Sequence, residues 1–364
     1  MLQFLLAAYY PFVGCVIALQ IILIGVIGVV FRMLPCGVFL ILIALGALIS
    51  SLIHMLYACR VLFTPIKDVK DPLELKLPKK EHTIIYSWVN SIAKENDLIP
   101  PDEIRLGASA IAHVFESAKG KNVLVLGGMA VGTFTKTALS GIVAHELAHF
   151  THGDTALSRG CAKRMMLMQA LEHAFFASDI GMINPIAWLV ILYHRLFMVQ
   201  YCSLSQEQEY AADEWEVSHA GKEVAAATLI HLHVTQRMPW VRLTSVVDTA
   251  VATGQPVPKD VFAEQARRAK AAPRDEWERM MKKELAEPTK STDSHPALKD
   301  RLAAIGVKPK RALEFALDPQ GEPATNLFPA WESIQYDLSG RLTMVAFERR
   351  QSIADAGQIL RAGM

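Results

Sequence analysis

The sequence predicts a mainly α-helical protein with a small β-sheet, preceded by an N-terminal hairpin of two transmembrane helices. Two long uncharged apolar runs occupy residues 13–31 and 36–58. Most of the chain beyond them has apolar residues at helical spacing. One pair of neighbouring segments, residues 104–115 and 122–131, is instead rich in residues that favour strands. The 364 residues suffice for one large soluble domain in addition to a membrane segment.

The two apolar runs predict a membrane hairpin over residues 1–62. Each approaches the roughly 20 apolar residues that a helix needs to cross a bilayer. Pro35 lies between them, where it disfavours one continuous helix. A cleaved signal peptide does not fit, because no Lys or Arg precedes Arg32 and the apolar stretch is too long. The alternative is a hairpin buried in a soluble core, which the absence of a polar face disfavours.

Charge predicts the orientation of this hairpin and excludes one class of partner. The turn carries Arg32 alone, whereas Arg60 and several lysines follow the second run. By the positive-inside rule, that flank and the rest of the chain face the cytoplasm. The formal net charge is only +1, so there is no electrostatic case for nucleic acid as a partner. The five cysteines are scattered without a C-x-x-C pair, which is consistent with a reducing compartment.

The segments after the hairpin predict the elements of the soluble part. Residues 63–80 are charged and contain Pro, as in a linker, and residues 82–96 and 137–150 have helical spacing. Residues 104–115 and 122–131 predict a hairpin of two strands. Further helices are predicted at residues 162–178, 185–204, 207–220 and 258–288.

One apolar run in this part allows two interpretations. Residues 185–204 are long enough to suggest a third membrane span, but His194 and Arg195 lie near the middle of the run. Both side chains would be costly in lipid. We therefore predict a buried or membrane-surface helix there rather than a third span.

A metal-binding motif lies in the helix predicted at residues 137–150. His145, Glu146 and His149 form the pattern H-E-x-x-H, and residues at i and i+4 share one helix face, so both imidazoles can reach one ion. Zn²⁺ accepts imidazole nitrogen readily, whereas Glu146 is better placed to reach a water on that ion. Chance alone would give the pattern in about one chain in a hundred of this length. A metal also explains why so apolar a helix carries these groups.

A hydrolytic zinc site needs a third protein ligand and one open position, and an acidic segment beginning at Glu207 supplies a candidate. Glu209 and Asp213 are four residues apart on one predicted helix face. This spacing suits a ligand and an outer carboxylate that accepts a hydrogen bond from a ligand imidazole. Taken alone, the segment is typical of a solvated acidic face. Together with H-E-x-x-H it predicts Glu209 as the third ligand of one Zn²⁺ per chain.

Three motifs carry a resemblance to a known family. They are H-E-L-A-H with a following H-G-D from His145, S-x-x-x-E-Y-x-A-D from Ser205, and Ser294-His295-Pro296 with a following Arg301. Over residues 60–305 the chain resembles the HtpX-like membrane zinc metallopeptidases, which are gluzincins related to the CaaX prenyl protease. The resemblance implies a set of site residues: His145, His149 and Glu209 as zinc ligands, Glu146 as the general base, and Asp213 as the partner of His145.

The resemblance also implies what the whole protein is. It implies an α+β gluzincin-type catalytic domain at residues 63–305 and a C-terminal extension at residues 306–364. The protein would be an integral membrane metalloendopeptidase of a bacterial inner membrane, with the catalytic domain in the cytoplasm. Its partners would be the lipid bilayer and a membrane-associated protein or peptide substrate, which pairs with an edge strand predicted at residues 104–115.

The reaction so predicted is peptide-bond hydrolysis by a zinc-activated water, with Glu146 as the general base. The enzyme would serve either quality control of membrane proteins or the processing of particular ones. The alternative is a non-proteolytic, membrane-bound zinc scaffold. Glu146 disfavours it, because a purely structural zinc is typically enclosed by four ligands and has no use for an adjacent base.

The chain departs from the family's pattern in three places. Gln206 stands where the family has Arg, and His113-Val114-Phe115 stands where it has Asn-Ala-Phe. The interval between His149 and Glu209 offers one convincing apolar run, whereas HtpX has two spans there. For His295 two roles stay open: it donates a hydrogen bond to the oxyanion of the tetrahedral intermediate, or it is a structural residue that packs beside Pro296.

Overall fold

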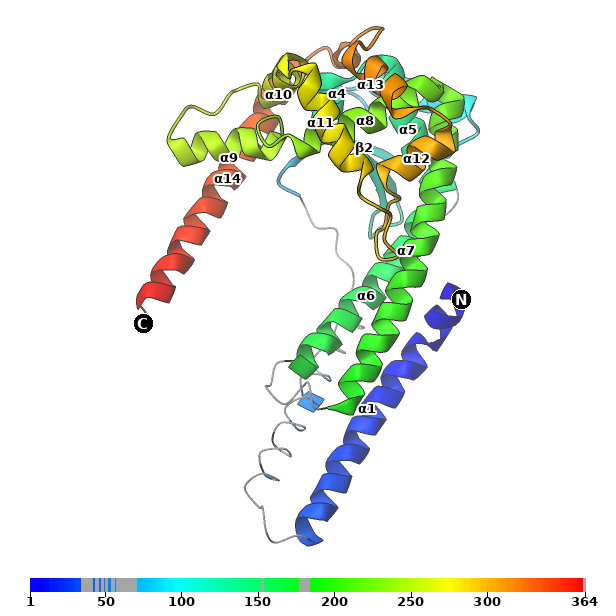
Figure 1. Cartoon of the computed structure of the whole chain (residues 1–364), viewed down its shortest axis with the longest axis vertical. Helices are drawn as coiled ribbons and strands as arrows, with labels where there is room; N and C mark the ends of the chain where they lie inside the picture. Colours follow the sequence, from blue (N-terminus) through cyan, green and yellow to red (C-terminus); the bar gives the residue numbers. More distant parts are fainter. Residues whose placement is uncertain are drawn as a thin grey trace. The chain divides into compact units, whose positions relative to one another are not determined.

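The computed structural model describes residues 1–33, 71–151, 154–176 and 184–362, together with isolated positions between residues 42 and 56. Figure 1 shows the helices and strands of these residues. The chain divides into two compact units. The first comprises Met1–Lys67, Ala156–Gln206 and Ser291–Ser294, and the second comprises Asp68–Thr155, Glu207–Lys290 and His295–Met364.

The described residues of the first unit lie mainly in long helices. α1 (Leu2–Met33), most of α6 (Asp154–Phe176) and the first part of α7 (Pro185–Ala220) share a core of buried apolar side chains. α1 and α7 are long and apolar enough to cross a membrane, judged by length and composition. α1 contains the predicted first span, residues 13–31, whereas most of the predicted second span, residues 36–58, lies outside the described residues.

α7 is one continuous helix where the sequence predicts two. The apolar part at residues 185–204 runs without a break into the acidic part at residues 207–220, because no Pro or Gly stands between them. Trp188, Leu192 and Leu196 are exposed on this helix at a spacing of four residues, so they share one face. α7 therefore carries both an exposed apolar stripe and the acidic residues of the predicted metal site.

A four-stranded sheet opens the second unit. β1 (Glu74–Leu77), β2 (Glu103–Gly107), β4 (Asn122–Gly127) and β3 (His113–Glu116) lie side by side in that order. β1 is antiparallel to β2, β2 is parallel to β4, and β3 is antiparallel to β4. The edge strands are therefore β1 and β3. β1 lies in the segment predicted as a linker, residues 63–80, so that prediction is wrong for these four positions.

The sequence predicts a hairpin between residues 104–115 and 122–131, and only the end of the first range, in β3, pairs with β4 in this way. β3 and β4 form an antiparallel pair joined by a short turn, but residues 104–115 are not one strand. The chain leaves the sheet after Gly107 and returns as β3 on the far side of β4. A Cβ at Gly127 would lie 2.6 Å from the backbone oxygen of Ile111. The connection between β2 and β3 passes so close to β4 that only glycine fits there.

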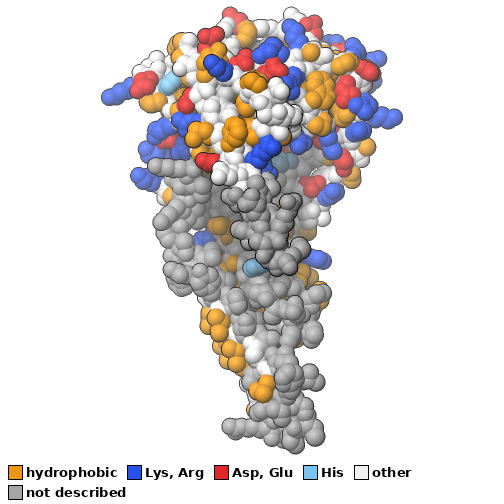
Figure 2. Space-filling model, turned by 90° about the vertical axis from the view of Figure 1, so that its left-hand side faces the viewer, with side chains coloured by type: hydrophobic (Ala, Val, Ile, Leu, Met, Phe, Trp, Pro, Cys, Tyr) orange, Lys and Arg blue, Asp and Glu red, His pale blue; other side chains and the backbone are white. Residues whose placement is uncertain are grey.

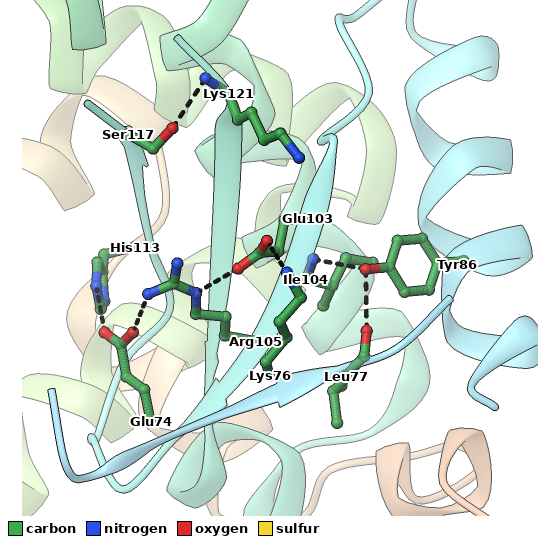
Figure 3. Close-up of polar contacts among 10 residues, drawn as sticks. All are labelled: Glu74, Lys76, Leu77, Tyr86, Glu103, Ile104, Arg105, His113, Ser117 and Lys121. Carbon is green, nitrogen blue, oxygen red and sulfur yellow. Dashed lines mark hydrogen bonds and ion pairs between the residues drawn. The ribbon is translucent and has the colours of Figure 1, made fainter. Parts of the chain in front are cut away.

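An ion-pair network covers one face of this sheet (Figure 3). Arg105 in β2 donates from Nε to Glu103 at 2.7 Å and from Nη1 to Glu74 at 2.9 Å. Its guanidinium also lies over the ring of Phe115, 5.4 Å from the ring centre. Glu74 in turn lies 3.8 Å from His113. The network therefore connects the edge strands β1 and β3 across the strands between them.

The opposite face of the sheet packs against helices. α3 (Thr83–Glu95) and α5 (Lys136–Thr151) confirm the helices predicted at residues 82–96 and 137–150 within one residue at each end. α4 (Gly128–Thr133) occupies positions that the sequence predicts as the end of a strand. Apolar side chains of all three helices belong to the same buried core as those of the sheet, so the sheet serves as the platform on which α5 is held.

The rest of the second unit is helical. α10 (Val261–Ala271) and α11 (Arg274–Leu285) confirm the helical character predicted for residues 258–288, although Pro273 divides the region in two. α6, most of which belongs to the first unit, begins at Asp154, eight residues before the predicted start at 162. On the face shown in Figure 2, acidic and basic side chains are interspersed over the upper part of the view, as in water-facing domains. The remaining elements are α8 (Lys222–Arg237), α9 (Leu243–Thr253), α12 (Leu298–Ile305), α13 (Pro309–Leu317), the 3-10 helix η2 (Ala324–Leu327) and α14 (Trp331–Ala362).

A buried histidine makes the stability of the second unit depend on pH. His231 of α8 packs against the rings of Phe134 and Trp277, with ring centres 5.1 and 5.3 Å away. Burial lowers the pKa of His231 to about 4. In the unfolded chain, His231 binds a proton below about pH 6.5. In the folded chain, the same residue binds a proton only near pH 4. Its contribution to stability is therefore complete above pH 6.5 and is lost as the pH falls towards 4.

We expect His231 to cost the fold about 2 kcal/mol of unfolding free energy between about pH 7 and about pH 5. Chemical denaturation of the metal-free protein at the two pH values measures this. His231→Leu is expected to remove that part of the pH dependence, because leucine takes up no proton. An equal pH dependence in both proteins would contradict the assignment.

Candidate active site

Two helices bring the predicted metal ligands together. α5 carries His145 and His149 one turn apart, and α7 carries Glu209. The two helices approach closely at Gly141, one turn before His145, where a Cβ would lie 2.8 Å from the Cβ of Ala220. The glycine therefore permits an approach that any side chain would oppose. This approach explains how residues so far apart in sequence come to face each other.

The donor atoms of these three residues are spaced as ligands of one ion. Nε2 of His145 lies 3.7 Å from Oε2 of Glu209, and Nε2 of His149 lies 3.7 Å from Oε1. These distances are too long for hydrogen bonds. Ligands at 2.0–2.1 Å around a tetrahedral ion are themselves about 3.3 Å apart. Two imidazoles and a carboxylate within 4.8 Å of one another therefore fit a zinc ion, in donor chemistry as well as in separation.

Asp213 lies near the other ring nitrogen of His145. Its Oδ1 is 3.3 Å from Nδ1 of His145. Arg301 of α12 donates from Nε to the other oxygen of Asp213 at 2.8 Å and forms a second, shorter bond from Nη2 to Oδ1. Nη1 of Arg301 is also 3.4 Å from Oε2 of Glu209. Arg301 thus links the two carboxylates, a contact that sequence reasoning missed.

A further carboxylate, that of Glu216, completes this buried group. Glu216 follows Asp213 by three residues on α7, and its Oε2 lies 3.9 Å from Nδ1 of His145. The side chain is buried, which corrects the idea of a solvated acidic face for this position. The exposed members of the acidic segment are Glu207 and Glu214. Glu209, Asp213 and Glu216 are spaced i, i+4 and i+7, so they share one face of α7. Glu207 and Glu214 do not share this spacing and are exposed.

His295 lies at the edge of the same group. Its Nδ1 is 3.0 Å from Oε1 of Glu209, and 62% of its side chain is exposed. The hydrogen bond with the Glu209 carboxylate raises the pKa of His295. The structure therefore joins His295 to the predicted zinc ligands, in a position that water and substrate can reach.

Charge interactions set the protonation of these groups before a metal binds. Burial works against a charge on His145, but the carboxylates of Asp213, Glu209 and Glu146 raise its pKa to about 9. Burial likewise works against a charge on Glu209, yet His295, His145 and Arg301 hold its pKa far below the usual range. Burial raises the pKa of Glu146, and it raises that of Glu216 to about 7. A metal that binds here must displace a proton from His145.

The fold is mainly α-helical with a small sheet, and the three grouped donors form a candidate metal site. The model of Peptidase family M48 matches residues 102–307, which is more than half of the chain. This stretch contains every residue of the candidate site. The chain belongs to this family, whose members are metallopeptidases.

Solved structures that match the chain include that of S. mikatae Ste24p, with 13% sequence identity and a TM-score of 0.29. The match covers 79% of this chain and 62% of that one, so the chain spans less than two thirds of the length of this neighbour. No curated protein matches the sequence.

Proposed function

We propose that this protein is a membrane-anchored zinc metalloendopeptidase. The observation that carries the proposal is the convergence of His145, His149 and Glu209, with donor atoms at separations that suit one ion. These three residues would hold one Zn²⁺ per chain. When bound, Zn²⁺ polarises the scissile carbonyl and lowers the pKa of a water towards about 7.

Glu146 acts as the general base. It follows His145 directly on α5 and lies beside His149 on the helix surface, three residues away. The raised pKa of its carboxyl group makes the carboxylate a better acceptor for the proton of the attacking water. Glu146 then passes that proton to the leaving amine of the substrate.

Asp213 and His295 assist at opposite sides of the site. Oδ1 of Asp213 lies 3.3 Å from Nδ1 of His145, where it is placed to take the proton of that nitrogen and so to leave Nε2 of the ring for the ion. His295 is exposed and carries a raised pKa, which suits a protonated donor to the oxyanion of the tetrahedral intermediate. Its contact with Glu209 holds the ring at the edge of the site until a substrate arrives.

The substrate is an extended segment of a protein or peptide that pairs with β3. The sequence predicts the edge strand within residues 104–115. The first part of that range belongs to β2, which has a neighbouring strand on each side and so has no free edge. β3 is an edge strand, and its other neighbours include α5, the helix of the predicted metal ligands. An edge strand offers a row of backbone groups with which an extended peptide can pair.

The membrane anchor consists of the predicted hairpin at residues 1–62, with the apolar part of α7 as a further contact with lipid. The length and composition of α1 and α7 and the exposed stripe on α7 support this placement. The catalytic domain, residues 63–305, lies on the cytoplasmic side of a bacterial inner membrane. There it cleaves membrane-associated proteins, in quality control or processing.

The zinc content of the Glu209→Ala variant tests the proposal. The purified full-length protein is expected to hold about one zinc per chain, and Glu209→Ala is expected to lose nearly all of it on dialysis, because a three-ligand site loses a ligand. Elemental analysis measures both. Glu207→Ala, two residues away and exposed, serves as the control and should keep its zinc. Unchanged zinc in Glu209→Ala would place the third ligand elsewhere.

Hydrolysis of unfolded casein, with and without a chelator, separates a protease from a zinc scaffold. A protease is expected to lose its activity with the chelator and regain it with added Zn²⁺. A protein that holds zinc at the expected ratio but never cleaves casein or a membrane-protein substrate would favour the scaffold.

A further inference from the structure

Glu216 is a buried carboxylate with incomplete pairing. Its side chain is 4% exposed, and Oε2 lies 3.9 Å from Nδ1 of His145. Among the residues that the structure describes, Oε1 has no hydrogen-bond partner. A charged carboxylate in such a place costs several kcal/mol unless a nearby group offsets it, and the raised pKa of Glu216 reflects that cost. A carboxylate that is retained at this cost calls for an explanation beyond packing.

The helix that carries the histidines leaves space for this side chain. A Cβ at Gly141 would lie 3.0 Å from Cγ of Glu216, closer than a side chain can be packed without displacing it. Gly141 and His145 are one turn apart on α5, so the space that the glycine leaves open adjoins the imidazole. The approach of α5 and α7 therefore places the carboxylate of Glu216 next to Nδ1 of His145.

Asp213 alone does not supply a full negative charge at this nitrogen. Arg301 binds both oxygens of Asp213, through Nε and Nη2, and so offsets much of its charge. Glu216 adds a second carboxylate beside the same Nδ1. An imidazole whose outer N–H faces negative charge is a stronger metal ligand through its other nitrogen.

We propose that Glu216 is a positioning residue that acts through His145: beside Asp213, its carboxylate adds negative charge near Nδ1, favours the ring orientation with Nε2 towards the metal and strengthens that nitrogen as a ligand. The inference rests on the proposed function, because it requires a metal at His145, His149 and Glu209. The competing explanation is that Glu216 merely fills the space beside Gly141.

Zinc affinity, measured by competition with a chromophoric chelator, tests this role without recourse to catalysis. Glu216→Gln keeps the size of the side chain and removes its charge, and Glu216→Leu removes the charge with an apolar group. Both are expected to weaken zinc binding by about 10- to 100-fold, the usual effect of losing an outer partner of a ligand. Glu214→Gln, at the exposed neighbouring position, should bind zinc as the wild type does.

The melting temperature of the metal-free protein separates this role from packing. Replacing a buried, incompletely paired carboxyl group by an amide is expected to leave the melting temperature of Glu216→Gln unchanged or raise it, while zinc binding weakens. Glu216→Asp provides a second discrimination, since it keeps the charge and leaves a gap. We expect its zinc affinity to lie between those of the wild type and Glu216→Gln, whereas a space-filling role predicts that Asp is the worse substitute.

Two results would overturn the inference. One is wild-type zinc affinity in either Glu216→Gln or Glu216→Leu, and the other is weaker binding in Glu216→Asp than in Glu216→Gln. Failure of the proposed function looks different, because the wild-type protein itself would then bind no zinc at His145, His149 and Glu209.

Discussion

Glu146→Gln is expected to abolish hydrolysis while the protein still holds zinc. The amide has nearly the size of the carboxylate but cannot take a proton from water at neutral pH. A positioned general base contributes about 10²- to 10⁴-fold to a rate, so we expect cleavage to fall by about a thousandfold or more. Glu146 is not among the three grouped donors, so the zinc-to-protein ratio should stay at the wild-type value.

Cleavage of unfolded casein and elemental analysis of the same preparation provide the two measurements. Glu207→Gln makes the same chemical change at an exposed position and should retain full activity and full zinc. A Glu146→Gln protein that cleaves casein at the wild-type rate would remove Glu146 from the mechanism. A protein that loses zinc together with activity would instead assign Glu146 to the metal.

The sequence predicts those parts of the site that depend on local geometry. His145 and His149 are one turn apart on a single helix, so their common face follows from helix geometry alone. The structure brings Glu209 to them and Asp213 to the other ring nitrogen of His145, as the pairing of the two motifs predicts. That His145, His149 and Glu209 bind zinc, and that Asp213 supports His145, stays a prediction for zinc measurements to test.

The sequence does not reveal that Arg301 and Glu216 lie beside the site, because both positions depend on contacts between distant segments. Arg301 meets Asp213 across 88 positions of the chain, and no local pattern reports such a contact. A weak signal exists: Leu298, Arg301 and Ile305 are spaced i, i+3 and i+7 in α12, so the arginine occupies an inward-facing position. For Glu216 the signal is its spacing of i+7 from Glu209 and i+3 from Asp213, which places the three carboxylates on one face of α7.

The sheet shows the same limit of sequence reasoning. The turn between β3 and β4 is local and is predicted correctly, whereas the parallel pairing of β2 with β4 is not local. Gly107 interrupts the β-rich run at residues 104–115 and could have indicated the break. β1 has only four residues, with charged side chains at alternate positions, so its pairing with β2 is needed to reveal it.

Arg301→Met is expected to destabilise the metal-free protein by about 3–5 kcal/mol, the usual effect of removing one partner from a buried ion pair. The side chain of Arg301 is 9% exposed and contacts both Asp213 and Glu209. Methionine fills much of the same volume but leaves these buried carboxylates without their guanidinium. Chemical denaturation in the presence of a chelator measures the loss without a contribution from bound metal.

Two further variants show whether the loss comes from unpaired charge. Arg311→Met removes an arginine whose side chain is 58% exposed and whose partner Glu314 lies 3.8 Å away, so it should cost no more than about 1 kcal/mol. Asp213→Asn in the Arg301→Met background removes one of the stranded charges, and the double variant should be more stable than the sum of the two single losses implies. Strict additivity, or an Arg301→Met protein as stable as the wild type, would mean that Arg301 does not offset the charge of Asp213. Zinc would then be held without the ion pair that the geometry places beside His145.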